Sequence, residues 1–341
     1  MIVWAVMSSR TAVGGMTRLV QGKSEDYKSS RAHLHGLDQL RLLAALLIFV
    51  QHTLSCSSHD EWIDIAGFRI GRIGTAIFFM LSGFLAATSR RPAFEWFIDR
   101  LRFLLPTFWI VTGIGFVLAA IGGRKEFDAW QVVCQFSGFG YFTHGERLIN
   151  IATWFLSPLL VLYAAVAVAK HKSCRWLSLI VTLFLLVTAT LKDENYATLY
   201  CHGAVFFLAY SICTYWPKLY RNMTPILPLG LAFLSLIQPE FRYGAVASIL
   251  LTFAIKVQSP NRIASTFSRI AYEWFLTQGI CLSLAMRITE MPLLLGLIGA
   301  VLSLFAAVSL KYSSTSFFKF ISTRHEAIAE RLGHPLSPRI L

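Results

Sequence analysis

The fold class of this chain is decided by the stretch LDQLRLLAALLIFVQH, residues 37–52. The stretch is apolar and nearly long enough to cross a lipid bilayer as a helix. Arg41 and His52 are eleven residues apart, three helical turns plus about 20°, so both fall on one helix face, about 16 Å apart along the axis. Ionisable side chains persist in such a segment mainly where they face a protein interior or a wet cavity. We therefore predict that Arg41 holds an anionic donor and that His52 marks a reacting centre deeper in the membrane.

The composition favours a membrane protein as well. Hydrophobic residues make up 55% of the 341 residues, charged residues only 14%, and the mean hydropathy is +0.58. A soluble globule with so little polar surface could not cover its core. The formal net charge of +13 would indicate a nucleic-acid partner in a soluble chain, but basic cytoplasmic loops explain it equally well here. We expect a lipid bilayer as partner and no nucleic acid.

Apolar segments of spanning or near-spanning length predict an all-α, polytopic fold with about ten transmembrane helices. The seventh and eighth segments are the shortest. The helices are expected at residues 37–56, 72–89, 103–122, 151–169, 176–191, 197–215, 224–238, 243–257, 268–287 and 291–310.

The distribution of basic residues orients these helices. With the N-terminus inside, 22 of the 31 lysines and arginines fall on the cytoplasmic side and 8 on the outer side, the remaining one being Arg41. Cytoplasmic loops are typically the richer in lysine and arginine. We expect a multi-pass protein of the inner (plasma) membrane with a cytoplasmic N-terminal segment (1–36), a ten-helix transmembrane domain (37–311) and a cytoplasmic C-terminal tail (312–341).

Several kinds of site find no support in the sequence. The six cysteines are dispersed without a CxxC pair, and no histidines have metal-ligand spacing within one helix, so we expect no metal site. Cys56 and Cys134 lie near the expected outer face, which leaves one disulfide open but not indicated. Neither a GxSxG elbow nor a Walker-type loop is present, which argues against a serine hydrolase and a nucleotide-driven pump.

Five motifs follow one another along the chain. They are Arg41 followed eleven residues later by His52, the run FFMLSGFL at 78–85, the basic stretch Arg90–Arg102 leading to Pro106, Trp154 with Tyr163, and SRIAYEWFL at 268–276. In this order and spacing, the chain resembles the integral-membrane acyltransferase 3 family, whose members modify bacterial surface glycans. The resemblance spans about residues 36–290. Each motif is weak by itself, and their order and spacing make the match specific.

The resemblance implies a membrane O-acyltransferase of the cell envelope. It would move an acyl group, which we expect to be acetyl, from cytoplasmic acyl-CoA to a hydroxyl of an extracytoplasmic glycan or glycolipid, as in polysaccharide O-acetylation. Acyl-CoA would be the donor substrate, and no permanently bound cofactor is implied. A non-catalytic membrane transporter or glycan-export component with the same fold is the alternative, because Ala76 and Gln278 replace an acid and a histidine that many members have.

The candidate residues divide by role. His52 would be the catalytic general base or would itself be acylated first, and both mechanisms stay open. Donor phosphates would be bound by Arg41, Arg100 and Arg102, because a guanidinium matches phosphate geometry. The candidate supporting residues are Ser82, Trp154, Tyr163 and Tyr272.

Each of these residues also has an ordinary structural explanation. Arg41 could snorkel to lipid headgroups, His52 could be a satisfied polar residue, and the arginines of the basic stretch could be positive-inside anchors. Glu273 lies four residues after Arg269 and is expected to form an interfacial ion pair with it. The outer loop 123–150 is rich in aromatic residues and could form part of an acceptor-binding lid.

The 22-to-8 charge split predicts the outcome of cysteine labelling. On a cysteine-free background, single cysteines placed in the 123–150 loop should react with an impermeant thiol reagent added outside intact cells. Cysteines placed at 90–102 should not react until the membrane is permeabilised. The opposite labelling pattern would reverse the orientation and, with it, the direction of acyl flow.

Overall fold

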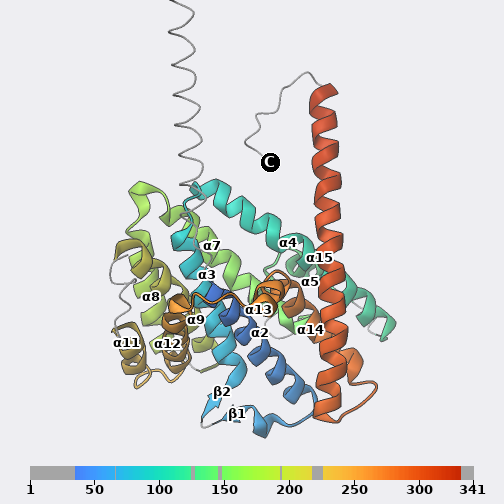
Figure 1. Cartoon of the computed structure of the whole chain (residues 1–341), viewed down its shortest axis with the longest axis horizontal. Helices are drawn as coiled ribbons and strands as arrows, with labels where there is room; N and C mark the ends of the chain where they lie inside the picture. The colour runs from blue at the N-terminus through green and yellow to red at the C-terminus, as the bar shows by residue number, and fades with distance from the viewer. Residues whose placement is uncertain are drawn as a thin grey trace, which may run out of the picture.

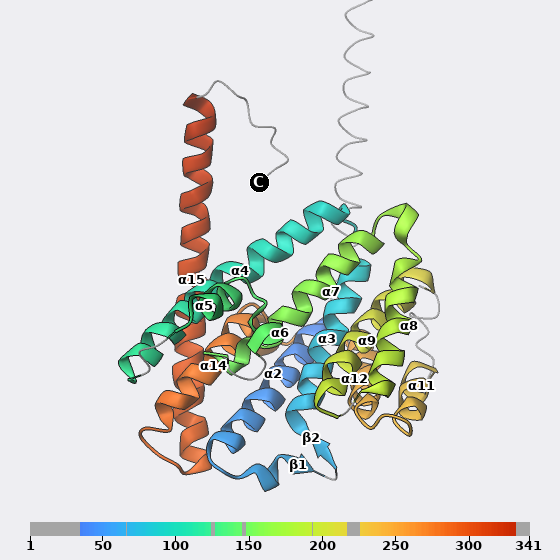
Figure 2. The ribbon, with the colours of Figure 1, turned by 180° about the vertical axis from the view of Figure 1, so that it is seen from behind.

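The computed structural model describes residues 35–65, 67–123, 127–144, 148–192, 194–216 and 226–331. The fold is an all-α bundle with one short hairpin (Figures 1 and 2). The helices are α2 (His35–Cys56), α3 (Ile70–Thr88), α4 (Ala93–Ile121), α5 (Ala129–Phe136), α6 (Gly140–His144), α7 (Leu156–Ala169), α8 (Leu177–Leu191), α9 (Glu194–Tyr215), α11 (Ile226–Leu234), α12 (Phe241–Lys256), α13 (Arg262–Ser268), α14 (Ala271–Ala285) and α15 (Pro292–Arg331). Three 3-10 turns are η1 (Asp60–Trp62), η2 (Ile151–Thr153) and η3 (Lys172–Cys174), and β1 (Asp64–Ile65) pairs antiparallel with β2 (Phe68–Arg69).

The prediction of an all-α membrane protein is confirmed. In the described part of the chain, α2, α3, α4, α9 and α15 are long and apolar enough to cross a membrane, and α7 and α8 are shorter apolar helices. Large apolar side chains point outward, for example Leu183 and Phe184 on α8 and Val301 and Phe305 on α15. Such a surface suits lipid rather than water. The number of ten spans stays a prediction.

Helix α3 forms the centre of the bundle, between α2 and α9 (Figure 2). Glycines permit these close approaches. A Cβ atom at Gly74 would lie 2.5 Å from the carbonyl oxygen of Ala44 on α2, and one at Gly83 would lie 2.0 Å from that of Phe206 on α9. Membrane helices pack in this way because lipid provides no hydrophobic force to press them together, so backbones must come near.

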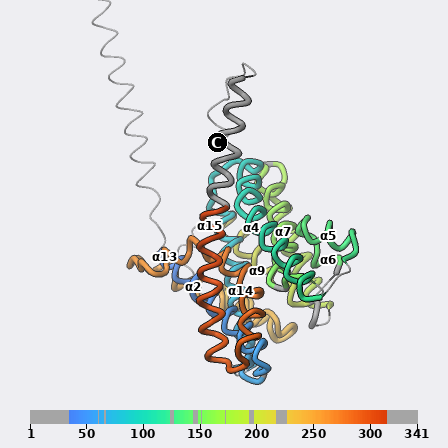
Figure 3. The backbone as a smooth tube through the Cα atoms, turned by 90° about the vertical axis from the view of Figure 1, so that its right-hand side faces the viewer, coloured from blue at the N-terminus to red at the C-terminus, as the bar shows by residue number. Residues whose placement is uncertain are grey.

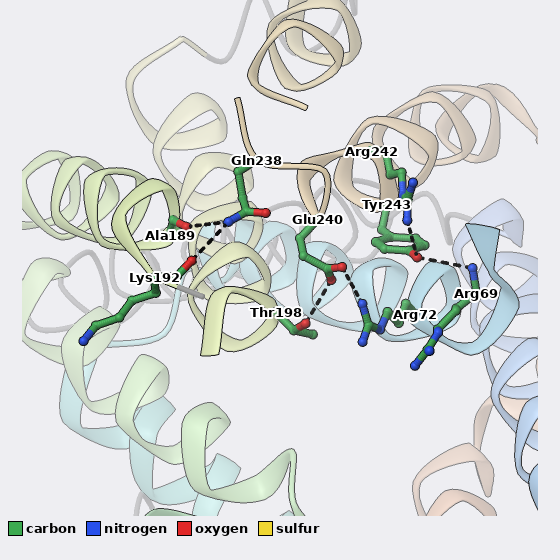
Figure 4. A network of polar contacts seen from close by, with 9 residues as sticks. All are labelled: Arg69, Arg72, Ala189, Lys192, Thr198, Gln238, Glu240, Arg242 and Tyr243. Carbon is green, nitrogen blue, oxygen red and sulfur yellow. Dashed lines mark hydrogen bonds and ion pairs between the residues drawn. The ribbon is translucent and has the colours of Figure 1, made fainter. Parts of the chain in front are cut away.

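Polar contacts tie the ends of α3, α9 and α12 to the hairpin (Figure 4). Arg72 forms an ion pair with Glu240, whose second carboxylate oxygen accepts a hydrogen bond from Thr198 at 2.9 Å. The backbone N–H of Arg69 donates to the Tyr243 hydroxyl at 3.2 Å. All these residues lie at the end of the bundle that also contains His52, because Gly71, next to Arg72, contacts Gln51. The contacts fix the relative positions of helices from three parts of the chain.

Several observed bounds differ from those expected. Helix α4 begins at Ala93 rather than at 103, so Arg100 and Arg102 of the basic stretch are helical and Pro106 lies inside the helix. Helix α11 has nine residues, about 14 Å, which is shorter than a bilayer core. Helix α15 runs without a break across the expected boundary at 311/312 to Arg331, side by side with α14 along its first part (Figure 3). Residues 1–34 of the N-terminal segment and 332–341 of the tail lie outside the described residues. All six cysteines are free, so Cys56 and Cys134 form no disulfide.

The contact at Gly83 predicts a stability loss on substitution. Gly83→Ala should lower the melting temperature of the detergent-purified protein, because the new methyl group would overlap the Phe206 carbonyl of α9. Gly230→Ala is the matched control, since a Cβ there meets no atom within 4 Å and alanine favours the helix by about 0.5–1 kcal/mol. Equal melting temperatures for the two variants would refute the packing role of Gly83.

Candidate active site

A cavity of about 280 Å³ lies where α2, α3, α4, α7 and α14 meet. Its walls are mostly apolar, with polar side chains from several helices. Five of the eight predicted site residues line it, namely Arg41, Ser82, Arg100, Tyr163 and Tyr272. The other lining residues are Ile48, Thr75, Phe78, Phe79, Leu85, Phe103, Leu104, Phe155, Leu159, Ser268, Ala271 and Phe275. The fold thus brings together residues that are more than 200 positions apart in the sequence.

Arg41 is held at the cavity by two hydrogen bonds. Its Nη1 donates to Asp38 Oδ1 and to Ser268 Oγ, each at 2.9 Å. Asp38 lies one turn earlier on α2, so the ion pair is local, whereas Ser268 ends α13. Both bonds use the same nitrogen. Among the described residues no partner bonds to Nη2, so that side of the guanidinium can bind an anion. Arg41 thus faces the cavity rather than lipid headgroups.

Positive charge concentrates where Arg41 meets the cavity, at what we call its cationic end. The Arg100 guanidinium lies 5.8 Å from the Trp96 ring centroid, and the Lys170 ammonium lies 5.6 Å from the same ring. Lys170 also donates to the carbonyl oxygens of Ala86 at 3.2 Å and Ser89 at 2.8 Å. Burial, and then the charge of Arg100, lower the pKa of Lys170 below its ordinary value. In the described part of the chain no carboxylate pairs with Arg100, so the cluster attracts anions.

Arg102 does not reach the cavity. It is exposed, whereas Arg100, Phe103 and Leu104 of the same helix line the cavity. Two residues turn a helix by 200°, so Arg102 and Arg100 point in nearly opposite directions. The predicted arginine pair is therefore separated by its own helix, and Arg102 lies in a position suited to an interfacial anchor.

His52 lies beyond the opposite end of the cavity. The lining residue of α2 nearest to it is Ile48, one helical turn away, or about 6 Å along the axis. The Nδ1 atom of His52 is buried and has no hydrogen-bond partner in the described structure. Arg41 and His52 share one face of α2, as predicted, because α2 is a single continuous helix. Ile48 lies between the two residues on that face. Arg41 lines the cavity, whereas His52 does not.

The family follows from comparison with known proteins. The family model described as an acyltransferase domain, Acyl_transf_3, matches residues 34–312. The chain belongs to the acyltransferase 3 family. Searches of curated proteins and of solved structures gave no match. The matched region contains the whole cavity, its cationic end and His52.

In this membrane acyltransferase an apolar cluster, the closure, lines the cavity at Ile48, one helical turn before His52. Phe275 meets Phe155 edge to face, with ring centroids 4.6 Å apart, and meets Phe78 at 6.1 Å. Ile48 and Ala152 belong to the same cluster. The sequence did not predict this closure, because its members come from four separate segments.

The four supporting candidates have different positions in the acyltransferase. Ser82 and Tyr163 line the cavity, and Tyr163 packs edge to face on Trp96 with centroids 5.3 Å apart. Tyr272 lines it as well, while its hydroxyl donates to the Leu104 carbonyl at 2.8 Å. Trp154 lies behind the wall, stacked on Phe79 at 6.5 Å.

The expected ion pair of Glu273 with Arg269 is wrong. Glu273 is 1% exposed and pairs with Lys311 of α15, with Nζ and Oε1 3.1 Å apart. The helix breaks between the two residues, since α13 ends at Ser268 and α14 begins at Ala271. The i,i+4 proximity that the prediction assumed requires one continuous helix. The pair therefore joins α14 to α15 rather than marking a membrane interface.

His202 of α9 is a polar residue that the sequence analysis missed. It is 2% exposed, its ring stacks on Phe79 at 5.5 Å, and its Nε2 has no partner among the described residues. Phe79 separates it from the cavity. A histidine in the middle of an apolar segment was the available signal.

The Glu273–Lys311 pair predicts how two substitutions affect stability. Lys311→Met should lower the free energy of unfolding by about 1–3 kcal/mol, because it leaves a buried carboxylate without its partner. Arg269→Met is the control and should leave it unchanged. Thermal melts of both variants in detergent provide the measurement. Restored stability in the Glu273→Gln, Lys311→Met double variant would support the pair, whereas an Arg269→Met loss equal to that of Lys311→Met would contradict it.

Proposed function

We propose that this acyltransferase moves an acyl group, which we expect to be acetyl, from cytoplasmic acyl-CoA to a hydroxyl of an extracytoplasmic glycan or glycolipid. The observation that carries the proposal is the cavity with Arg41 and Arg100 at one end and His52 one turn beyond the other. Anion-binding groups and a base at opposite ends of one passage suit a donor with a charged head and a reactive tip.

The donor's phosphates would bind at the cationic end. Guanidinium groups match phosphate oxygens in planar, bidentate geometry, and Arg41 is already oriented by Asp38 and Ser268. Lys170 adds a point charge nearby. The cavity of about 280 Å³ is smaller than most drug-sized sites, so it would hold the narrow pantetheine arm while the nucleotide stays outside. Apolar walls suit that arm.

His52 would act on the acceptor. Its neutral imidazole would take the proton from the acceptor hydroxyl as that oxygen attacks the thioester carbonyl, and such base catalysis contributes about 10²–10⁴-fold. A variant in which His52 is acylated first uses the same placement. In both cases the closure of Ile48, Phe78, Phe155 and Phe275 must open to admit the thioester. Until then it would keep water from the thioester.

The cytoplasmic side would be the side of the cationic cluster. This assignment rests on the excess of lysine and arginine expected on that side. With it we propose that both termini are cytoplasmic and that the protein lies in the inner membrane. The transporter or export alternative predicts no acyl-CoA-dependent change in the ester content of the surface glycan. Mass spectrometry of glycan from cells with and without the gene distinguishes the two functions.

Substitution of His52 tests the chemistry. His52→Ala should abolish acyl transfer while the protein still inserts and accumulates, because a base that acts in the chemical step contributes orders of magnitude to turnover. Glycan ester content at matched expression, measured by mass spectrometry, is the readout. Near-normal esterification in this variant would rule out His52 as the base.

Substitution of the arginines tests the donor end. Affinity for acetyl-CoA should fall stepwise from wild type through Arg41→Lys to Arg41→Ala, because lysine keeps the charge but loses the guanidinium fork. The full loss should be about 1.5–3 kcal/mol. Arg100→Ala should also weaken binding, whereas Arg102→Ala, on the opposite helix face, should not. Calorimetry on purified variants measures this, and unchanged affinity in Arg41→Ala would remove that residue from the donor site.

A further inference from the structure

Helices α2 and α14 run in the same direction and meet in successive layers. Arg41 contacts Ser268, just before α14, and further along Phe49 stacks on Trp274 with ring centroids 5.1 Å apart. Ile48 and Phe275 lie in one apolar cluster in the same layer. The next layer is therefore formed by the residues three and four positions later on each helix.

Those residues are His52 and Gln278. His52 follows Ile48 and Phe49 by one turn, and Gln278 follows Trp274 and Phe275 by one turn. Leu282, one turn further on α14, lies in the same apolar cluster as Phe49 and Cys56. Gln278 thus lies between Trp274 and Leu282, which share an apolar cluster with Phe49 and Cys56 of α2, and helical periodicity puts it at the level of His52.

Both side chains have buried polar atoms without partners. Gln278 is 1% exposed, and neither its Nε2 nor its Oε1 forms a hydrogen bond in the described structure. The same holds for Nδ1 of His52. Buried amide and imidazole groups are almost always hydrogen-bonded, because desolvating them without a partner costs free energy. Three such atoms at one level of the bundle indicate a place for the polar atoms of a ligand.

The neighbouring polar residue does not satisfy Gln278. Asn150 approaches α14 closely, and a Cβ at Gly279 would lie 2.8 Å from its Oδ1. Its Nδ2 donates to the Leu276 carbonyl at 2.8 Å, and its Oδ1 accepts from the N–H of Ala152 at 3.1 Å. The Asn150 amide is thus engaged with backbone groups, which leaves Gln278 as the unengaged amide of this layer.

We propose that His52 and Gln278 together form the acyl-transfer site, with Gln278 as a catalytic residue that donates its Nε2–H to the carbonyl oxygen of the acyl thioester. This proposal rests on the proposed function and adds to it a second group at the reacting atoms. A neutral amide suits the role, because it can donate a hydrogen bond in a buried site without the cost of burying a charge.

The acceptor hydroxyl gives its proton to His52 while its oxygen forms a bond to the thioester carbonyl carbon. The carbonyl π electrons move to the carbonyl oxygen, whose negative charge is stabilised by the Gln278 N–H. When the carbonyl re-forms, the C–S bond breaks, its electron pair leaves with the sulfur of CoA, and that sulfur takes the proton from the His52 imidazolium. The products are the ester and free CoA.

Gln278→Met is the decisive variant, because methionine has nearly the same shape and no hydrogen-bonding amide. The probe is radiolabelled acetyl-CoA supplied to membrane vesicles of expressing cells, with alkali-labile label in the glycan as the readout. We expect kcat to fall about 10²–10³-fold, the usual effect of losing one oxyanion donor, with KM for acetyl-CoA within twofold. The melting temperature should stay the same or rise, because an apolar side chain replaces unpartnered polar atoms.

Thr277→Val is the matched control. Thr277 is the buried neighbour on α14 and bonds to the carbonyl oxygens of Glu273, Trp274 and Ser303, away from the proposed site. Its activity should stay near wild type. A kcat for Gln278→Met within threefold of wild type, or a loss matched by Thr277→Val, would overturn the role of Gln278. A wild-type protein that binds acetyl-CoA but transfers no label would instead refute the proposed function, and this site with it.

Discussion

The partial burial of one guanidinium group, that of Arg41 in the first membrane helix, constrains the rest of the structure. A charge in this position is costly unless it is paired or hydrated. Asp38 supplies a carboxylate from the same helix, and Ser268 supplies a hydroxyl from a segment more than 200 residues later. The second contact brings the start of α14 to the start of α2. From there the two helices run side by side, so the pairing of Arg41 sets which layers of α2 and α14 meet.

This layering explains why the interior has three different environments. The cationic end contains Arg41 and Arg100, the middle is an apolar closure centred on Phe275, and the far layer contains His52. In the proposed function the charged donor head exchanges with water at the cationic end, whereas the base acts where water is excluded. The apolar middle keeps them apart while α2 runs continuously through all three. Helix α2 thus passes through all three environments.

The agreement between sequence and structure is closest where the interactions are local. The apolar segments, the shared face of Arg41 and His52 and the family motifs depend on composition and on helical periodicity, which a short stretch contains in full. The differences arose at helix boundaries, where the observed start or end of a helix changed the neighbours. Glu273 was paired with Arg269 on the assumption of one continuous helix, but α13 ends at Ser268 and Glu273 pairs with Lys311 instead. Helix α4 also began ten residues earlier than expected.

By itself the sequence determined that this protein is an all-α membrane protein of the acyltransferase 3 family, and it indicated five of the residues that line the cavity. Hydropathy, periodicity and motif order are properties of the chain alone. Only the tertiary structure decided that Lys170 joins the cationic end, that aromatic rings from separate segments cluster in the cavity wall, and that His52 and Gln278 have buried polar atoms without a partner among the described residues. Those relations depend on which helices pack together and in which layer, and long-range contacts such as Arg41 with Ser268 establish them in the folded chain.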